Sequence, residues 1–156
     1  MTVQPFVPAG FEPPTTLATE QFRLEPLGPL HNERDHAAWT SSIEHIRATP
    51  GYPDGTWPPL GGMTLKENLR DLRRHADDFA QRVGFTFTVL DVGGDDVIGC
   101  VYLYPSASEE CDVTVQSWVR ADRATLDEPL ADAVARWLAD AWPWQRVDRC
   151  GRSTSA

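Results

Sequence analysis

The sequence has few basic side chains and no long apolar run. Only 14 lysines and arginines stand against 23 aspartates and glutamates, which gives a formal net charge of −9. A field of this sign repels nucleic-acid phosphates and anionic lipid surfaces, so we expect neither as a partner. Because the chain shows no signal-peptide pattern and no apolar segment of membrane-spanning length, we expect a cytoplasmic protein.

Cysteine is also scarce in this chain. Its three cysteines are Cys100, Cys111 and Cys150. The number is odd and no pair has the spacing of metal ligands, so we expect neither a disulfide framework nor a metal site. With 156 residues, of which 41% are hydrophobic, the chain is long enough for one domain with its own core.

Composition divides the chain into three parts. Residues 1–18 are rich in proline and threonine and lack periodicity, which predicts an extended arm. Residues 19–150 carry regular hydrophobic patterns and are expected to form the single domain. Residues 151–156 are polar, which predicts a disordered tail.

The hydrophobic patterns of the domain predict strands and helices in a mixed order. Alternating or continuous apolar residues predict strands over residues 22–27, 85–90, 97–104, 112–119 and 144–149. Helical spacing predicts helices over residues 33–47, 64–83 and 126–141. Antiparallel hairpins followed by a final strand–helix–strand crossover indicate an α+β protein, with a mixed, mostly antiparallel sheet and flanking helices.

Local signals predict where these helices begin and end. Asn32 is the expected N-cap of the first helix, and Gly84 is the expected stop of the second. Thr64 and Glu67 have the spacing of a capping box, as do Thr125 and Glu128 before the third helix.

The loop over residues 50–62 is long and carries aromatic side chains. It contains four prolines and four glycines, together with Tyr52 and Trp57. Irregular loops of this length are often functional, so both aromatic residues are candidates for substrate binding. The alternative for Trp57 is that it fills the edge of the core.

The strand patterns also carry a resemblance to a known family. Residues 17–27 read LATEQFRLEPL, which resembles the opening of GNAT N-acetyltransferases of the ribosomal-protein type. Residues 85–90 and 97–101 look like the central hairpin of that family, and residues 117–120 like its splayed fourth strand. The resemblance covers residues 17–149 and implies a GNAT-like acyl-CoA N-acyltransferase fold that is shortened at its C-terminal end.

The same resemblance implies where acetyl-CoA would bind. A bulged fourth strand leaves amides free for the pantetheine arm, and the following turn and helix N-terminus bind the pyrophosphate. The matching cofactor-binding residues in this chain are Trp118, Val119, Arg120, Arg123 and Thr125.

The turn departs from the family pattern, which places two glycines in it. Asp127 and Pro129 take the glycine positions here, and no glycine occurs between Val101 and Cys150. A glycine-free turn with acidic residues predicts weaker cofactor binding.

The candidate catalytic residue is a carboxylate. Enzymes of the ribosomal-protein type often carry a glutamate at the position of Thr114, and Asp112 lies on the same strand face one pleat earlier. Asp112 is therefore the candidate general base, with a solvated strand-end carboxylate as the alternative.

The resemblance implies an N-acetyltransferase that moves an acetyl group from acetyl-CoA to a primary amine of a small molecule or peptide. The alternative is a catalytically inactive GNAT-like domain that binds a ligand or a protein. Trp142 and Trp144 flank Pro143 near the predicted last strand. If that strand forms an exposed edge, these indoles favour a homodimer.

Overall fold

The sheet is built around a hairpin in the middle of the chain. The computed structural model describes residues 5–53 and 55–152, and within them β3 (Phe85–Asp91) pairs antiparallel with β4 (Val97–Pro105). The other strands are β1 (Leu17–Ala18), β2 (Phe22–Pro26), β5 (Val113–Val119) and β6 (Val147–Asp148). The sheet order is β1-β2-β3-β4-β5-β6, and only β5 and β6 are parallel. The predicted α+β class and mostly antiparallel mixed sheet are confirmed.

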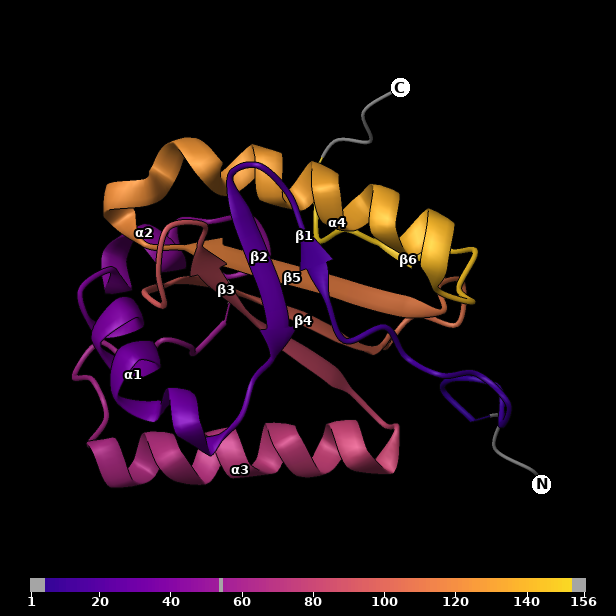
Figure 1. The fold of residues 1–156 in the computed structure, drawn as a ribbon, viewed down its shortest axis with the longest axis horizontal. Helices are drawn as coiled ribbons and strands as arrows, with labels where there is room; N and C mark the ends of the chain where they lie inside the picture. Colours follow the sequence, from indigo (N-terminus) through magenta and orange to yellow (C-terminus); the bar gives the residue numbers. More distant parts are fainter. Residues whose placement is uncertain (1–4, 54, 153–156) are drawn as a thin grey trace.

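Helices cover both faces of this sheet (Figure 1). They are α1 (Asn32–Thr40), α2 (Ile43–Arg47), α3 (Leu65–Gln81) and α4 (Asp127–Ala141), with short 3₁₀ turns η1 (Pro29–His31) and η2 (Ala121–Leu126). In Figure 1, α3 and α4 lie on opposite sides of the strands, and α1 lies on the side of α3. None of the helices in the described residues combines the length and apolarity needed to cross a membrane.

Two hydrophobic clusters fill the spaces between these layers. One lies between the sheet and α4, where Leu130, Val134 and Leu138 pack on strand residues. The other joins Trp39 of α1 to Trp118 of β5, and both side chains are fully buried. Alternate residues of each strand therefore face different clusters, as the period of a β-strand requires.

The first helical pattern forms two helices, where the sequence predicted one over residues 33–47. The chain turns at Ser41 and Ser42 between α1 and α2. The Ser41 hydroxyl donates to the Ala38 carbonyl at 2.8 Å, and the Ser42 backbone N–H donates to the Trp39 carbonyl at 3.0 Å. Serine side chains that bond to nearby backbone groups compete with the helix and interrupt it here.

Two predicted helix ends also differ. Asn32 is the first residue of α1, and the N-cap is His31, the last residue of η1, with no side-chain cap hydrogen bond. The α3 helix has the predicted capping box of Thr64 and Glu67, but it ends at Gln81, and its C-cap is Arg82, which has a left-handed φ of 65°. Gly84 has another role: a Cβ there would lie 2.1 Å from the Tyr104 ring.

The N-terminal segment packs on the domain. Residues 17–18 form β1, while Val7 is buried and Phe6 stacks on Trp144 with 4.6 Å between ring centroids. Trp142 and Trp144 are consequently only 6% and 7% exposed. The exposed indoles on which the homodimer prediction depended are therefore not found, because this segment covers them.

Candidate active site

A cavity of about 310 Å³ opens between α3, the loop after α2 and the sheet. We call it the Asp35 pocket. Its wall is formed by residues Leu27, Asp35, Gly51, Tyr52, Gly55, Thr56, Trp57, Asn68, Asp71, Leu72, Arg74, His75, Tyr102 and Gln116. This volume is at the lower end of the range of small-molecule sites, roughly 300–1,000 Å³.

A buried hydrogen-bond network holds the carboxylate of the pocket in place. The Asn68 side-chain nitrogen donates to Asp35 at 3.1 Å and to the Asn32 side-chain oxygen at 2.9 Å. The Asn68 oxygen accepts from the Trp39 indole at 2.9 Å. Burial raises the pKa of Asp35 to about 6, and the hydrogen bond from Asn68 offsets part of that rise.

Aromatic side chains form much of the remaining wall. The Trp57 ring lies 5.4 Å from Trp39, 6.2 Å from Tyr52 and 6.1 Å from Trp118, measured between ring centroids. The structure thus brings Tyr52 and Trp57 together at the pocket, and Trp57 also packs against the core. The Tyr52 hydroxyl is buried and has no hydrogen-bond partner within the described part of the chain.

His75 contributes a neutral imidazole to the pocket. Its Nδ1 lies 2.9 Å from the Tyr104 hydroxyl and 3.0 Å from the Thr86 hydroxyl. Tyr104 in turn donates to Asp78 at 2.8 Å. Burial lowers the pKa of His75 to about 4, and the nearby Arg74 charge acts in the same direction. His75 was not singled out as a site residue from the sequence.

The sheet opens beside the pocket, between β5 and β6. The β6 strand pairs only with Val113 and Thr114. Among the described residues, Val115 to Val119 have no strand partner on that side. Gln116 lies along this open edge and in the pocket wall, and its side-chain nitrogen donates to the Gly51 carbonyl at 2.9 Å.

The chain itself covers part of this opening. The Arg152 guanidinium donates to the Ser117 carbonyl at 3.4 Å and forms an ion pair with Asp127 at 2.8 Å. Arg152 falls in the predicted tail, and residues 153–156 of that tail lie outside the described residues.

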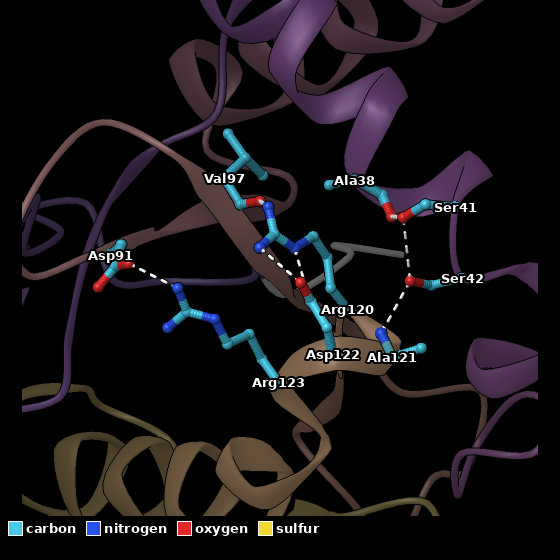
Figure 2. A network of polar contacts seen from close by, with 9 residues as sticks. All are labelled: Ala38, Ser41, Ser42, Asp91, Val97, Arg120, Ala121, Asp122 and Arg123. Carbon is cyan, nitrogen blue, oxygen red and sulfur yellow. Dashed lines mark hydrogen bonds and ion pairs between the residues drawn. The ribbon is translucent and has the colours of Figure 1, made fainter.

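Figure 2 shows the turn that follows β5, with its polar groups bonded to the rest of the chain. The Ala121 backbone N–H donates to the Ser42 hydroxyl at 2.8 Å. Arg120 pairs with Asp122 at 3.0 Å, and Arg123 pairs with Asp91 at 2.7 Å. These two arginines reach toward the ends of the β3–β4 hairpin, where Arg120 also donates to the Val97 carbonyl.

Thr125 does not cap α4. It lies inside η2, and the N-cap residue of α4 is Leu126, with no side-chain hydrogen bond. The predicted capping box with Glu128 is therefore absent, because the 3₁₀ turn continues directly into the helix. Thr125 borders a separate open hollow with Asp127, Glu128 and His45.

Asp112 lies outside the Asp35 pocket. It precedes β5 and borders a different hollow with Trp144 and Arg146. Its carboxylate accepts from the backbone N–H groups of Gln145 and Arg146 and forms an ion pair with the Arg146 side chain at 2.9 Å. These contacts, led by the Arg146 side chain, lower the pKa of Asp112 and make it a weaker proton acceptor.

Reasoning from the sequence overlooked Asp35, the one carboxylate buried in the pocket. A usable signal was its position four residues before Trp39, on the buried face of the same helix. A charge on such a face needs a structural or functional partner. The role of Asn68 carried no comparable signal, since its partners come from another helix.

The comparisons with solved structures identify the architecture. A ribosomal-protein-S5-alanine acetyltransferase from Vibrio fischeri superposes with a TM-score of 0.66 at 14% identity, over 86% of this chain and 72% of that one. A proposed ribosomal-protein-serine acetyltransferase from Vibrio cholerae gives 0.58 at 10% identity, over 78% and 65%. The microcin C7 self-immunity acetyltransferase MccE, solved with acetyl-CoA and AMP, gives 0.59 at 10% identity, over 78% and 63%.

These neighbours share an acetyltransferase architecture. The chain has the GNAT N-acetyltransferase fold, and the predicted resemblance is confirmed at the level of the fold. The chain spans slightly less than two thirds of the Vibrio cholerae protein and of MccE. No family model matches the sequence, and no curated protein matches it significantly.

Acetyl-CoA, which MccE binds, would contact two parts of this site, the open edge of β5 and the turn that follows β5. The open edge suits its pantetheine arm better than the turn suits its pyrophosphate. The open edge of β5 beside Gln116 offers strand backbone of the kind that a pantetheine arm can pair with. In the turn after β5, a pyrophosphate would have to displace existing partners, because the Ala121 amide and both arginines are already bonded.

Proposed function

We propose that this chain is an N-acetyltransferase that transfers an acetyl group from acetyl-CoA to a primary amine held in the Asp35 pocket. The observation that carries the proposal is that Gln116 belongs to both parts of the site. It lies in the wall of the pocket and on the strand whose edge is open. An acceptor in the pocket would therefore lie next to a donor aligned along β5.

Asp35 is the proposed proton acceptor. Because its pKa is raised to about 6, its carboxylate takes a proton more readily than an ordinary aspartate at neutral pH. Tyr52 and Trp57 would enclose the acceptor, while Trp118 and Val119 would contribute the backbone edge. Acetyl-CoA would supply the acyl group. In this proposal Asp112 connects the start of β5 to the segment before β6 and takes no part in proton transfer.

The test is release of free coenzyme A thiol when the protein is incubated with acetyl-CoA and a panel of primary amines. Asp35→Asn keeps the shape of the side chain and removes the base, so we expect roughly a 100-fold loss of rate or more. Asp77→Asn is the matched control, since Asp77 is exposed on α3 and does not line the pocket. Equal rates for both variants would refute the role of Asp35.

A second candidate is a ligand-binding domain without transferase activity. The observation that favours it is the engaged turn after β5, together with Arg152 across the open edge. Calorimetric titration with acetyl-CoA separates the two candidates. Binding in the micromolar range supports the transferase, whereas no binding at millimolar concentration leaves only the binding domain.

A further inference from the structure

The charged groups of the Asp35 pocket are unevenly distributed. Asp71 and Arg74 form an ion pair at 3.7 Å, and their side chains are 34% and 60% exposed, which places them at the mouth. His75 is neutral near pH 7, since burial lowers its pKa to about 4. Among the described residues of the wall, the remaining charged group is Asp35, which is 4% exposed.

Asp35 has a neutral partner in the folded chain. Its carboxylate accepts a hydrogen bond from the Asn68 amide, and no arginine or lysine in residues 5–53 and 55–152 forms a salt bridge with it. His36, whose Nε2 contacts the Met63 carbonyl, acts on Asp35 only through space and lowers its pKa slightly against the effect of burial. A buried carboxylate with a neutral partner is stabilised by a cation that enters the pocket.

The aromatic walls of the Asp35 pocket suit the apolar part of such a cation. Tyr52, Trp57 and Tyr102 present aromatic rings around the cavity, and the Trp57 and Tyr102 centroids are 6.4 Å apart. Aromatic rings attract a cation electrostatically and stack on flat apolar groups. The buried Tyr52 hydroxyl, which lacks a partner among the described residues, offers one further polar contact.

We infer that the Asp35 pocket selects a compact amine with a single positive charge and a flat apolar body, and that it rejects amines carrying a neighbouring carboxylate or a second charge. The inference rests on the proposed function only in treating this pocket as the acceptor site. A carboxylate beside the amine would face Asp35, which has no arginine or lysine salt bridge within the described residues, while Arg74 at the mouth is paired with Asp71. A second ammonium group would lose its hydration in the cavity without a carboxylate of its own, because Asp35 pairs with the first amine and Asp71 is paired with Arg74.

Calorimetric titration of the full chain, without any acyl donor, tests this selection. Tryptamine is the probe, and three other compounds are titrated for comparison. Tryptophan adds a carboxylate, tryptophol replaces the amine by a hydroxyl, and spermidine carries additional charges without a ring. We expect tryptamine to bind roughly tenfold more tightly than each of the three, or better.

Variants separate the electrostatic explanation from simple shape. Asp35→Asn should lower tryptamine affinity roughly tenfold or more and leave tryptophol binding unchanged. Asp77→Asn should leave both unchanged. Thermal unfolding followed by circular dichroism verifies that Asp35→Asn is folded. Trp57→Leu is a second variant, which removes part of the aromatic wall and should weaken the binding of all indole ligands.

The inference fails if tryptophan or spermidine binds as tightly as tryptamine, or if Asp35→Asn binds tryptamine normally. Because no acetyl donor is present, such a result would leave the transferase proposal standing with another acceptor class. Conversely, selective tryptamine binding without thiol release would support the pocket's selectivity and count against the transferase.

Discussion

The Arg152 guanidinium forms a two-pronged ion pair with Asp127, with nitrogen–oxygen distances of 2.8 and 3.0 Å. The two side chains are only 11% and 19% exposed. The pair joins the segment after β6 to the first turn of α4, across the open edge of β5. At the same time it neutralises an acidic residue that lies where an anion would approach the helix.

Removing this ion pair should affect both the stability of the fold and the binding of an anionic cofactor. We expect Arg152→Ala to lower the free energy of unfolding by about 1–3 kcal/mol, because a shielded charged hydrogen bond is lost. We also expect weaker calorimetric binding of coenzyme A, because Asp127 is then left unpaired where the phosphates would approach the helix. The exposed Arg146, which pairs with Asp112 instead, supplies the control Arg146→Ala. Unchanged coenzyme A binding in Arg152→Ala would show that the charge of Asp127 does not influence the approach of the cofactor.

Two buried groups should impose opposite pH dependences on stability. The pKa of Asp35 is raised from 3.8 to about 6, so the folded state binds the extra proton in this window and stability falls as the pH rises. The pKa of His75 is lowered from 6.5 to about 4, so the unfolded state binds the extra proton and stability rises with pH. Between about pH 4 and 6 the two effects oppose each other.

In Asp35→Asn, the pH dependence of the free energy of unfolding should therefore show the contribution of His75 alone. We expect its free energy of unfolding to rise from pH 4 to 6 more steeply than that of the unmodified protein, by up to about 1.4 kcal/mol per pH unit. Urea unfolding at several pH values measures this slope. His75→Gln should give the opposite change. If the free energy of unfolding changes with pH in the same way in all three proteins, the opposite pKa shifts of Asp35 and His75 are contradicted.

Gly99 of β4 pairs with Val119 of β5, and its position leaves no room for a side chain. A Cβ at this position would be 2.4 Å from the Trp118 carbonyl oxygen, a backbone atom that cannot move aside without disturbing the sheet. We expect Gly99→Ala to lower the free energy of unfolding by about 1–3 kcal/mol or more. In Gly93→Ala, the new Cβ would have no heavy atom within 4 Å, so its effect should stay within about 0.5 kcal/mol. Equal stabilities, measured by urea unfolding, would refute the close approach.

The N-terminal segment should contribute measurably to stability. Phe6 stacks on Trp144 and Phe85, and its carbonyl accepts a hydrogen bond from the Trp144 indole at 2.9 Å. We expect Phe6→Ala to cost about 1–3 kcal/mol and to raise the solvent exposure of Trp144. Intrinsic fluorescence and its acrylamide quenching report that exposure. Glu12→Ala, at an exposed position of the same segment, should change neither property.

The sequence by itself determined the elements whose signals are local. The alternation over residues 85–90 and 97–104 predicted the central hairpin, and the spacing of Thr64 and Glu67 predicted the start of α3, because the cap and the pattern lie within a few neighbouring residues. The resemblance at residues 17–27 and 117–120 gave the fold, with its opening beside β5.

Only the tertiary structure decided what surrounds the site. Asp35 and Asn68 are 33 residues apart in sequence, and Arg152 and Asp127 are 25 apart, so no local pattern links either pair. The covering of Trp144 by Phe6 joins residues 138 positions apart. Such contacts depend on how the helices and the N-terminal segment pack on the sheet, and packing also sets burial, which in turn sets the pKa of Asp35. Periodicity reports the face on which a side chain lies, whereas the chemistry of that side chain depends on the distant residues that meet it there.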